Sequence, residues 1–142
     1  MDYEKLIAFH NRENPFTKEM GVHVIEIREG YAKLKLDVEK GHTNALGIVH
    51  GGCLFTVADS ACGVAASSYE KKSVTVNACI NYLSPALRVK ELIGEATVIK
   101  HGKRISVFQA EVKDESGNLL VRGEFTYYDL GKNVKKINDN IK

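Results

Sequence analysis

The sequence predicts an α+β fold in which a curved antiparallel β-sheet wraps around one long central helix. Three observations support this prediction. A long, alanine-rich segment near the middle of the chain is apolar on nearly all sides. Two segments with the periodicity of β-strands precede it and four follow it, the later ones joined by short, turn-rich connections. A helix that is apolar nearly all round must be covered, and a strongly curved antiparallel sheet can cover it.

The chain is expected to open with a helical segment and a hairpin. Residues 1–20 form the N-terminal helical segment, whose apolar pattern Pro15 interrupts. Between residues 22 and 38 apolar side chains alternate with polar ones, and Gly30 marks a turn in the middle. Alternation of this kind predicts two antiparallel strands with one buried face.

The central helix is expected from about Gly51 to Ser68, after a polar, glycine-containing loop at residues 40–49. The later strands are expected at residues 73–83, 91–101, 104–114 and 119–129. Because their connections are short, neighbouring strands are predicted to be antiparallel, while the order of strands in the sheet stays open. Residues 1–142 are assigned to one domain that ends in a polar tail at 131–142.

The composition argues against two classes of partner. Lys and Arg number 20 and Asp and Glu 18, so the net charge is +2, whereas a dedicated nucleic-acid binder normally has a basic face. No apolar run approaches the roughly 20 residues that cross a bilayer, and no signal peptide is recognisable. Cys53, Cys62 and Cys79 lie in apolar stretches without metal-ligand spacing. We therefore expect a cytoplasmic protein with buried free thiols and neither nucleic-acid nor membrane partners.

The start of the central helix, His50-Gly51-Gly52, is a candidate binding site for a carbonyl oxygen. The first amide groups of a helix have no internal acceptors, and the positive end of the helix dipole lies behind them. An oxygen that develops negative charge is stabilised at such a place. The alternative is that the two glycines only allow the helix to begin in a tight space.

Asp59 lies about two turns inside this apolar helix. It shares a helix face with Gly52, Phe55, Cys62, Gly63 and Ala66. Burying a carboxylate among such neighbours costs about several kcal/mol unless it has partners. No Lys or Arg occurs between residues 41 and 70, so a structural role would require a cation from elsewhere or a cluster of donors. We interpret Asp59 as functional, because desolvated acids concentrate at active sites.

The spacing of Gly51 and Asp59 has a geometric consequence. They are eight residues apart, which is roughly 12 Å along a helix axis. A nucleophile or base must lie about 3 Å from the reacting carbon, beside the donors to its oxygen. Asp59 therefore cannot reach a carbonyl bound at Gly51 of its own helix. Two antiparallel copies of the helix would bring these groups together, so the active unit is at least a dimer if both groups act.

Seven residues of the loop and helix form a characteristic pattern, namely His42, Asn44, Gly47, His50, Gly51, Gly52 and Asp59. The pattern resembles the hotdog-fold acyl-CoA thioesterases of the phenylacetate-degradation type, relatives of the 4-hydroxybenzoyl-CoA thioesterases. The similarity extends over about residues 15–130 and includes 81–86 and 101–104. It implies a hotdog fold, a homodimer or homotetramer, and hydrolysis of acyl-CoA without a metal or organic cofactor.

Matched by position, the resemblance assigns a role to five residues. Asp59 is the nucleophile or general base, and the Gly51 N–H polarises the thioester carbonyl. Asn44 and His50 match residues that flank this carbonyl and order the loop. Thr75 falls where some relatives have a serine that helps to hold the attacking water. Each of the last three has an alternative, as a loop cap, a residue at the helix entry and an ordinary strand residue respectively.

Further residues are candidates for contact with the substrate. Gly52 and Ser84 belong to the matching segments, while Arg88, Lys103 and Arg104 are cations that could bind the phosphates of coenzyme A. The alternative for the cations is that they are simply solvated charges in turns and at strand ends. The acyl group cannot be read from the sequence, because Phe55, Tyr69 and Tyr82 fit either a pocket or the core.

Two other functions stay open. One is a non-catalytic acyl-CoA-binding or regulatory protein on the same fold, although such a protein would not need a buried acid. The other is a thioesterase that acts on acyl-carrier-protein thioesters. A hotdog dehydratase fits less well, because these enzymes have an Asp/His arrangement in a different local pattern.

Overall fold

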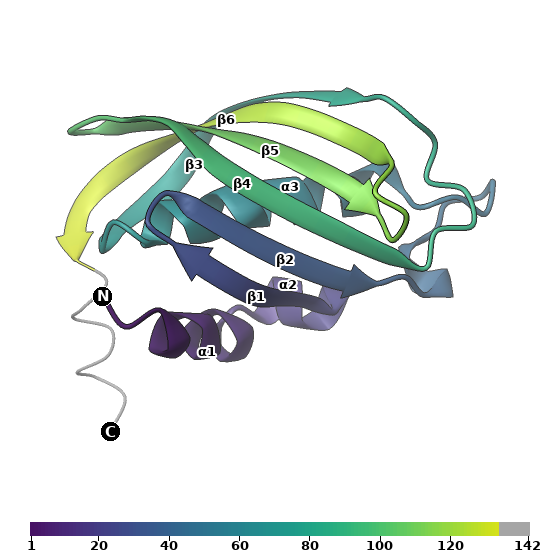
Figure 1. The fold of residues 1–142 in the computed structure, drawn as a ribbon, viewed down its shortest axis with the longest axis horizontal. Coiled ribbons are helices and arrows are strands. Elements are labelled where there is room, and N and C mark those ends of the chain that lie inside the picture. The colour runs from purple at the N-terminus through teal and green to yellow at the C-terminus, as the bar shows by residue number, and fades with distance from the viewer. Residues whose placement is uncertain (134–142) are drawn as a thin grey trace.

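The computed structural model describes residues 1–133, and it has a curved six-stranded antiparallel sheet around one long helix (Figure 1). The α+β prediction is therefore confirmed. The elements in chain order are α1 (Tyr3–Glu13), α2 (Pro15–Met20), β1 (Val22–Arg28), β2 (Tyr31–Asp37), the short 3-10 helix η1 (Lys40–His42), α3 (Gly51–Ser67), β3 (Lys71–Tyr82), β4 (Glu91–His101), β5 (Ile105–Asp114) and β6 (Leu119–Asn133).

The strand order is β1-β2-β4-β5-β6-β3, with every pair antiparallel. β3 and β4 follow one another in the chain and run in opposite directions, as predicted, but they are not neighbours in the sheet, whose strand order the sequence left open. The segment between them is not a hairpin turn, because it crosses the open end of the sheet beside the start of α3. There Ala86 is buried, and its carbonyl accepts a hydrogen bond of 3.1 Å from the amide of Val49.

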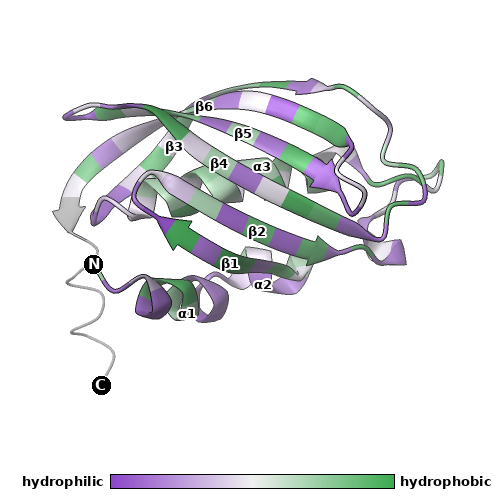
Figure 2. Ribbon diagram, in the orientation of Figure 1, coloured by the Kyte–Doolittle hydropathy of each residue, from purple (hydrophilic) through white to green (hydrophobic). Residues whose placement is uncertain are grey.

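The core lies between α3 and the concave face of the sheet. Small α3 residues such as Ala58 and Ala61 are fully buried, so the helix can approach the strands closely. Gly94 on β4 faces this contact, and a Cβ atom there would lie 2.5 Å from Cγ1 of Val57. Phe108 and Phe125 fill the space on β5 and β6. Figure 2 shows the alternation of apolar and polar residues along the strands that produces this one-sided burial.

One stripe of α3 is not fully covered by its own chain. Its members follow helical spacing and are exposed or half-buried: Gly52, Phe55, Thr56, Asp59, Ser60 and Gly63. The expectation that the helix is buried on all sides therefore holds for most of its surface but not here. The site described below lies along this stripe.

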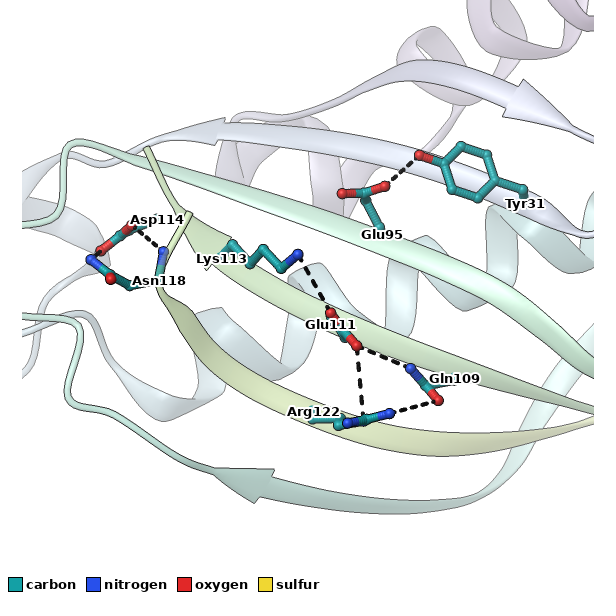
Figure 3. Close-up of polar contacts among 8 residues, drawn as sticks. All are labelled: Tyr31, Glu95, Gln109, Glu111, Lys113, Asp114, Asn118 and Arg122. Carbon is teal, nitrogen blue, oxygen red and sulfur yellow. Dashed lines mark hydrogen bonds and ion pairs between the residues drawn. The ribbon is translucent and has the colours of Figure 1, made fainter. Parts of the chain in front are cut away.

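The outer face of the sheet is polar (Figure 3). The Tyr31 hydroxyl donates to Glu95 at 2.5 Å, and Glu111 accepts a hydrogen bond of 3.1 Å from Gln109 and lies 3.9 Å from Arg122. Partly exposed pairs of this kind contribute about 1 kcal/mol or less each. These pairs therefore order side chains on the surface, and they contribute little to the stability of the fold compared with the core.

Two smaller expectations need correction. Cys53 and Cys62 are buried as predicted, but Cys79 is exposed, because it lies on the edge strand β3 and faces away from the core. The tail was expected from residue 131, whereas β6 continues to Asn133, and residues 134–142 lie outside the described part of the chain. Within residues 1–133, none of the helices is long and apolar enough to span a membrane.

Candidate active site

The first turn of α3 presents one free amide. The Nδ1 atom of His50 caps the helix by accepting from the Gly52 amide at 2.8 Å, and the His50 carbonyl accepts from Cys53 and Leu54. Among residues 1–133 the Gly51 amide has no acceptor, so it can donate to a ligand. The Gly51 N–H is therefore free to act as the predicted donor to a carbonyl oxygen. The Gly52 amide already donates to His50. Gly52 can therefore contribute to the site by letting a ligand approach closely, but not by donating a hydrogen bond.

The loop before α3 is held by its own polar side chains. The Oδ1 atom of Asn44 accepts from the amides of Leu46 and Ile48 at 2.9 and 3.4 Å. Its Nδ2 group makes no hydrogen bond within the described part of the chain and can donate. His42 accepts from the Glu39 amide through Nδ1, and its Nε2 lies 2.7 Å from the Met20 carbonyl, which ties the loop to α2.

A cavity of about 250 Å³ lies at this end of the helix. Its lining includes Asn44, Gly51, Leu54, Tyr82 and Ser84. The Tyr82 hydroxyl donates to the Gly51 carbonyl at 3.0 Å, which fixes the ring beside the free amide. The predicted candidates Asn44, Gly51 and Ser84 therefore meet at one cavity, and His50 caps the helix beside it. We call this cavity the amide half-site.

Asp59 lies at a second place, eight residues further along α3. Its Oδ1 atom accepts from the Thr75 hydroxyl at 2.8 Å and lies 2.8 Å from the Tyr127 hydroxyl. The Tyr127 hydroxyl also lies 2.7 Å from the main-chain oxygen of Asp59. No residue between 1 and 133 donates to Oδ2. The carboxylate is half-buried rather than fully buried, and hydroxyl donors stabilise it in place of a cation.

A second cavity of about 250 Å³ adjoins this carboxylate. Its walls come from α1, α2, β1, β2, α3 and β6 and include His10, Thr17, Val24, Leu34, Asp59, Gly63 and Tyr127. His10 lies 2.8 Å from the Ser67 hydroxyl, and burial lowers the pKa of His10 to about 4, so its imidazole is neutral near pH 7. Burial and the negative charge of Asp59 raise the pKa of Tyr127, which therefore remains a donor. We call this cavity the carboxylate half-site.

One chain does not bring the two half-sites together. Gly51 and Asp59 are separated by roughly 12 Å along α3, as their spacing requires. The cations are also divided between the two ends of the helix. Arg88 belongs to the β3–β4 connection, two residues after Ala86, which lines the amide half-site. Lys103 and Arg104 follow His101, whose ring stacks on Tyr69, just past the end of α3, with the ring centroids 3.7 Å apart.

Tyr127 is the residue that sequence reasoning missed. It lies directly opposite Thr75 in the β3–β6 register, so both side chains point toward α3. The alternation of Gly123, Phe125 and Tyr127 along β6 would have placed Tyr127 on the inner face. It would not have identified Asp59 as the partner of its hydroxyl, because that contact depends on how α3 lies across the sheet.

Comparison with known proteins gives a consistent set of similarities. Residues 46–121 match the family model of the Thioesterase superfamily. The chain is 29% identical to human acyl-coenzyme A thioesterase 13 over 86% of this chain and 90% of the human protein. It is 30% identical to the Escherichia coli acyl-coenzyme A thioesterase PaaI over 69% of this chain and 70% of that protein.

Solved structures have the same fold. The structure of Escherichia coli PaaI, from the phenylacetic acid degradation operon, superposes with a TM-score of 0.86 at 24% identity, and the match covers 92% of this chain and 94% of that one. A conserved protein from Pseudomonas aeruginosa superposes with a TM-score of 0.80 at 28% identity, covering 87% and 99% of the two chains.

Proposed function

The chain belongs to the thioesterase superfamily and has its hotdog fold, and from this membership we propose that it hydrolyses acyl-CoA thioesters to a free acid and coenzyme A. Two relatives that match most of its length are acyl-CoA thioesterases, which supports the same reaction here. The observation that carries the proposal is the carboxylate of Asp59. One of its oxygens is held by hydroxyls, the other has no donor within residues 1–133, and the residue lines a cavity.

The reaction begins with the thioester carbonyl at the amide half-site. Its oxygen accepts the free Gly51 N–H, and the positive end of the α3 dipole stabilises the charge that develops on this oxygen. Asn44 lines the same cavity and can donate through Nδ2.

Asp59 then acts by one of two routes. As a nucleophile, its oxygen forms a bond to the carbonyl carbon, the C–S bond breaks, and the resulting mixed anhydride is hydrolysed by water. As a general base, it takes a proton from a water that attacks the same carbon, and the proton passes to the departing thiolate. Both routes give one acid and one thiol. The Thr75 hydroxyl is engaged with Asp59 and can still accept a hydrogen bond from that water.

The complete site is proposed to form between two chains. Antiparallel packing of two α3 helices along their uncovered stripes would bring the amide half-site of one chain to the carboxylate half-site of the other. The edge strand β3 supports such pairing, since Val74 and Val76 are 45% and 55% exposed. An apolar, unpaired strand edge is a template for association. We therefore propose a homodimer, or a homotetramer built from two such dimers.

The cavity beside Asp59 is the proposed position of the acyl group. Its volume of about 250 Å³ exceeds the ~150 Å³ of a protein cavity that holds benzene. Val24, Leu34 and Val64 give it apolar walls, while His10 and Thr17 add polar groups. An aryl or medium-chain acyl group fits these dimensions, and a long alkyl chain would have to extend out of the cavity.

We also propose a cytoplasmic location. Cys53 and Cys62 are free, buried thiols, and Cys79 is free on the surface. Exposed free thiols are most compatible with a reducing compartment.

A panel of thioesters tests the proposed activity directly. Free-thiol release is measured with short-chain, medium-chain, long-chain and aryl acyl-CoAs, and with the same acyl groups on acyl-carrier protein. We expect turnover with aryl or medium-chain acyl-CoA and much slower release from the carrier protein. Tight acyl-CoA binding without thiol release would instead support a non-catalytic binding protein. Faster turnover of the carrier-protein thioesters would change the substrate class.

The double substitution Lys103→Ala with Arg104→Ala tests phosphate binding. We expect KM for acyl-CoA to rise about five- to tenfold, because charge-assisted hydrogen bonds to phosphates are lost. KM for the corresponding acyl-pantetheine, which lacks the nucleotide, should change little. Lys5→Ala with Arg12→Ala is the matched control, since it removes two exposed cations from α1. Equal changes with both substrates would exclude Lys103 and Arg104 from the phosphate site.

A further inference from the structure

The two oxygens of the Asp59 carboxylate have different surroundings. Hydroxyls from two adjacent strands converge on Oδ1, Thr75 from β3 and Tyr127 from β6. Oδ2 has no donor within residues 1–133. The terminal torsion of an aspartate is broad and roughly two-fold, so an unrestrained carboxylate would present either oxygen. Two donors on a single oxygen remove that freedom.

Tyr127 is suited to hold this carboxylate rigidly. Its side chain is only 4% exposed, and its ring packs edge-on against Phe108, with the centroids 5.9 Å apart and the planes at 86°. The hydroxyl fits against α3 because residue 63 is a glycine. A Cβ atom at Gly63 would lie 3.2 Å from the Tyr127 oxygen. The single proton of the hydroxyl is shared between Oδ1 and the main-chain oxygen of Asp59, so the hydroxyl is also anchored to the helix itself.

We infer that Tyr127 is a positioning residue, which fixes Oδ1 of Asp59 so that Oδ2 is the oxygen that attacks the thioester or takes the proton from water. The inference rests on the proposed function and adds to it the identity of the reacting oxygen. Tyr127 acts through Asp59 and does not touch the reacting carbon. Thr75 contributes a second donor from the more exposed side of the same oxygen.

Tyr127→Phe removes both contacts of the hydroxyl with Asp59 and keeps the packed ring. We expect kcat for the best acyl-CoA to fall about ten- to a hundredfold, the effect of losing a hydrogen bond to a charged group. KM should stay within about twofold, since the ground-state contacts of the substrate are kept.

Tyr128→Phe is the matched control, since its ring lies on the other face of β6 and is 39% exposed. It should keep wild-type kcat and KM.

The double variant Asp59→Asn with Tyr127→Phe separates positioning from a general effect on structure. If Tyr127 acts through the carboxylate, adding Tyr127→Phe should not lower the residual rate of Asp59→Asn further. A fall in kcat that only follows the loss of folded protein in a melting experiment would overturn the inference. So would wild-type kcat in Tyr127→Phe. Absence of thiol release by the wild type would instead overturn the proposed function, and the inference with it.

Discussion

Asp59→Asn loses nearly all thioester hydrolysis: we expect kcat to fall by about 10²- to 10⁴-fold, the usual contribution of a positioned nucleophile or base. An asparagine amide neither takes up a proton nor attacks a thioester at a useful rate. It does keep an oxygen that can accept from Thr75 and Tyr127, so the local structure is retained. Free-thiol release and thermal unfolding, measured on the same preparation, give the two readouts.

Asp59→Ala completes this test, because it removes the acceptor as well as the charge. Both variants should be equally inactive, while Asp59→Ala leaves the Thr75 hydroxyl without its acceptor and the Tyr127 hydroxyl with only the main-chain oxygen, and it should unfold at a lower temperature. Asp37→Asn, which removes an exposed carboxylate at the end of β2, should keep full activity. An active Asp59→Asn would mean that the residue has only a structural role.

Two inactive variants should restore activity when their chains are mixed. Gly51→Pro removes the amide that polarises the carbonyl, and proline is well tolerated at the first position of a helix. Gly51→Ala is its matched control, because it keeps the amide and its Cβ would meet the Tyr82 ring at an ordinary 3.4 Å. We expect Gly51→Pro to be nearly inactive and Gly51→Ala to retain most activity.

Gly51→Pro and Asp59→Asn are then unfolded and refolded together. In a mixed dimer one site has both lesions and the other has neither. With random pairing about half of the dimers are mixed, so activity should return to roughly a quarter of the wild-type value, because the two groups are roughly 12 Å apart on one helix. A mixture that stays inactive, although native mass spectrometry detects mixed dimers, would contradict a shared site.

The sequence predicted those parts of the fold that local patterns determine. The α1–α2 break at Pro15, the hairpin around Gly30 and the full length of α3 follow from chain stiffness and hydrophobic periodicity, which act over a few residues. The position of β3 in the sheet does not follow from such local patterns. The sequence left the strand order open, and β3 pairs with β6 at the edge of the sheet rather than with β4, the next strand in the chain. Pairing between distant strands is set by the closure of the whole sheet, which no local pattern contains.

The same distinction applies to the candidate site. The axial separation of Gly51 and Asp59 could be calculated from helix geometry alone. The family resemblance pointed to Thr75, which the structure brings to Asp59. Tyr127 was not found, because its contact combines the β3–β6 register with the rotation of α3 over the sheet. The sequence also did not show that the cations Arg88, Lys103 and Arg104 are divided between the two ends of α3, because this too depends on how α3 lies across the sheet.

The uncovered stripe of α3 also limits where residues can be inserted into this chain or deleted from it. Adding one residue between Gly51 and Asp59 would turn the carboxylate by about 100° around the helix axis, away from the strands that hold it. The same addition in the β5–β6 turn, at residues 115–118, would lengthen an exposed loop at little cost. Insertions and deletions should therefore be tolerated in the turns between strands. They should not be tolerated within the nine positions 51–59, whichever residues are substituted there.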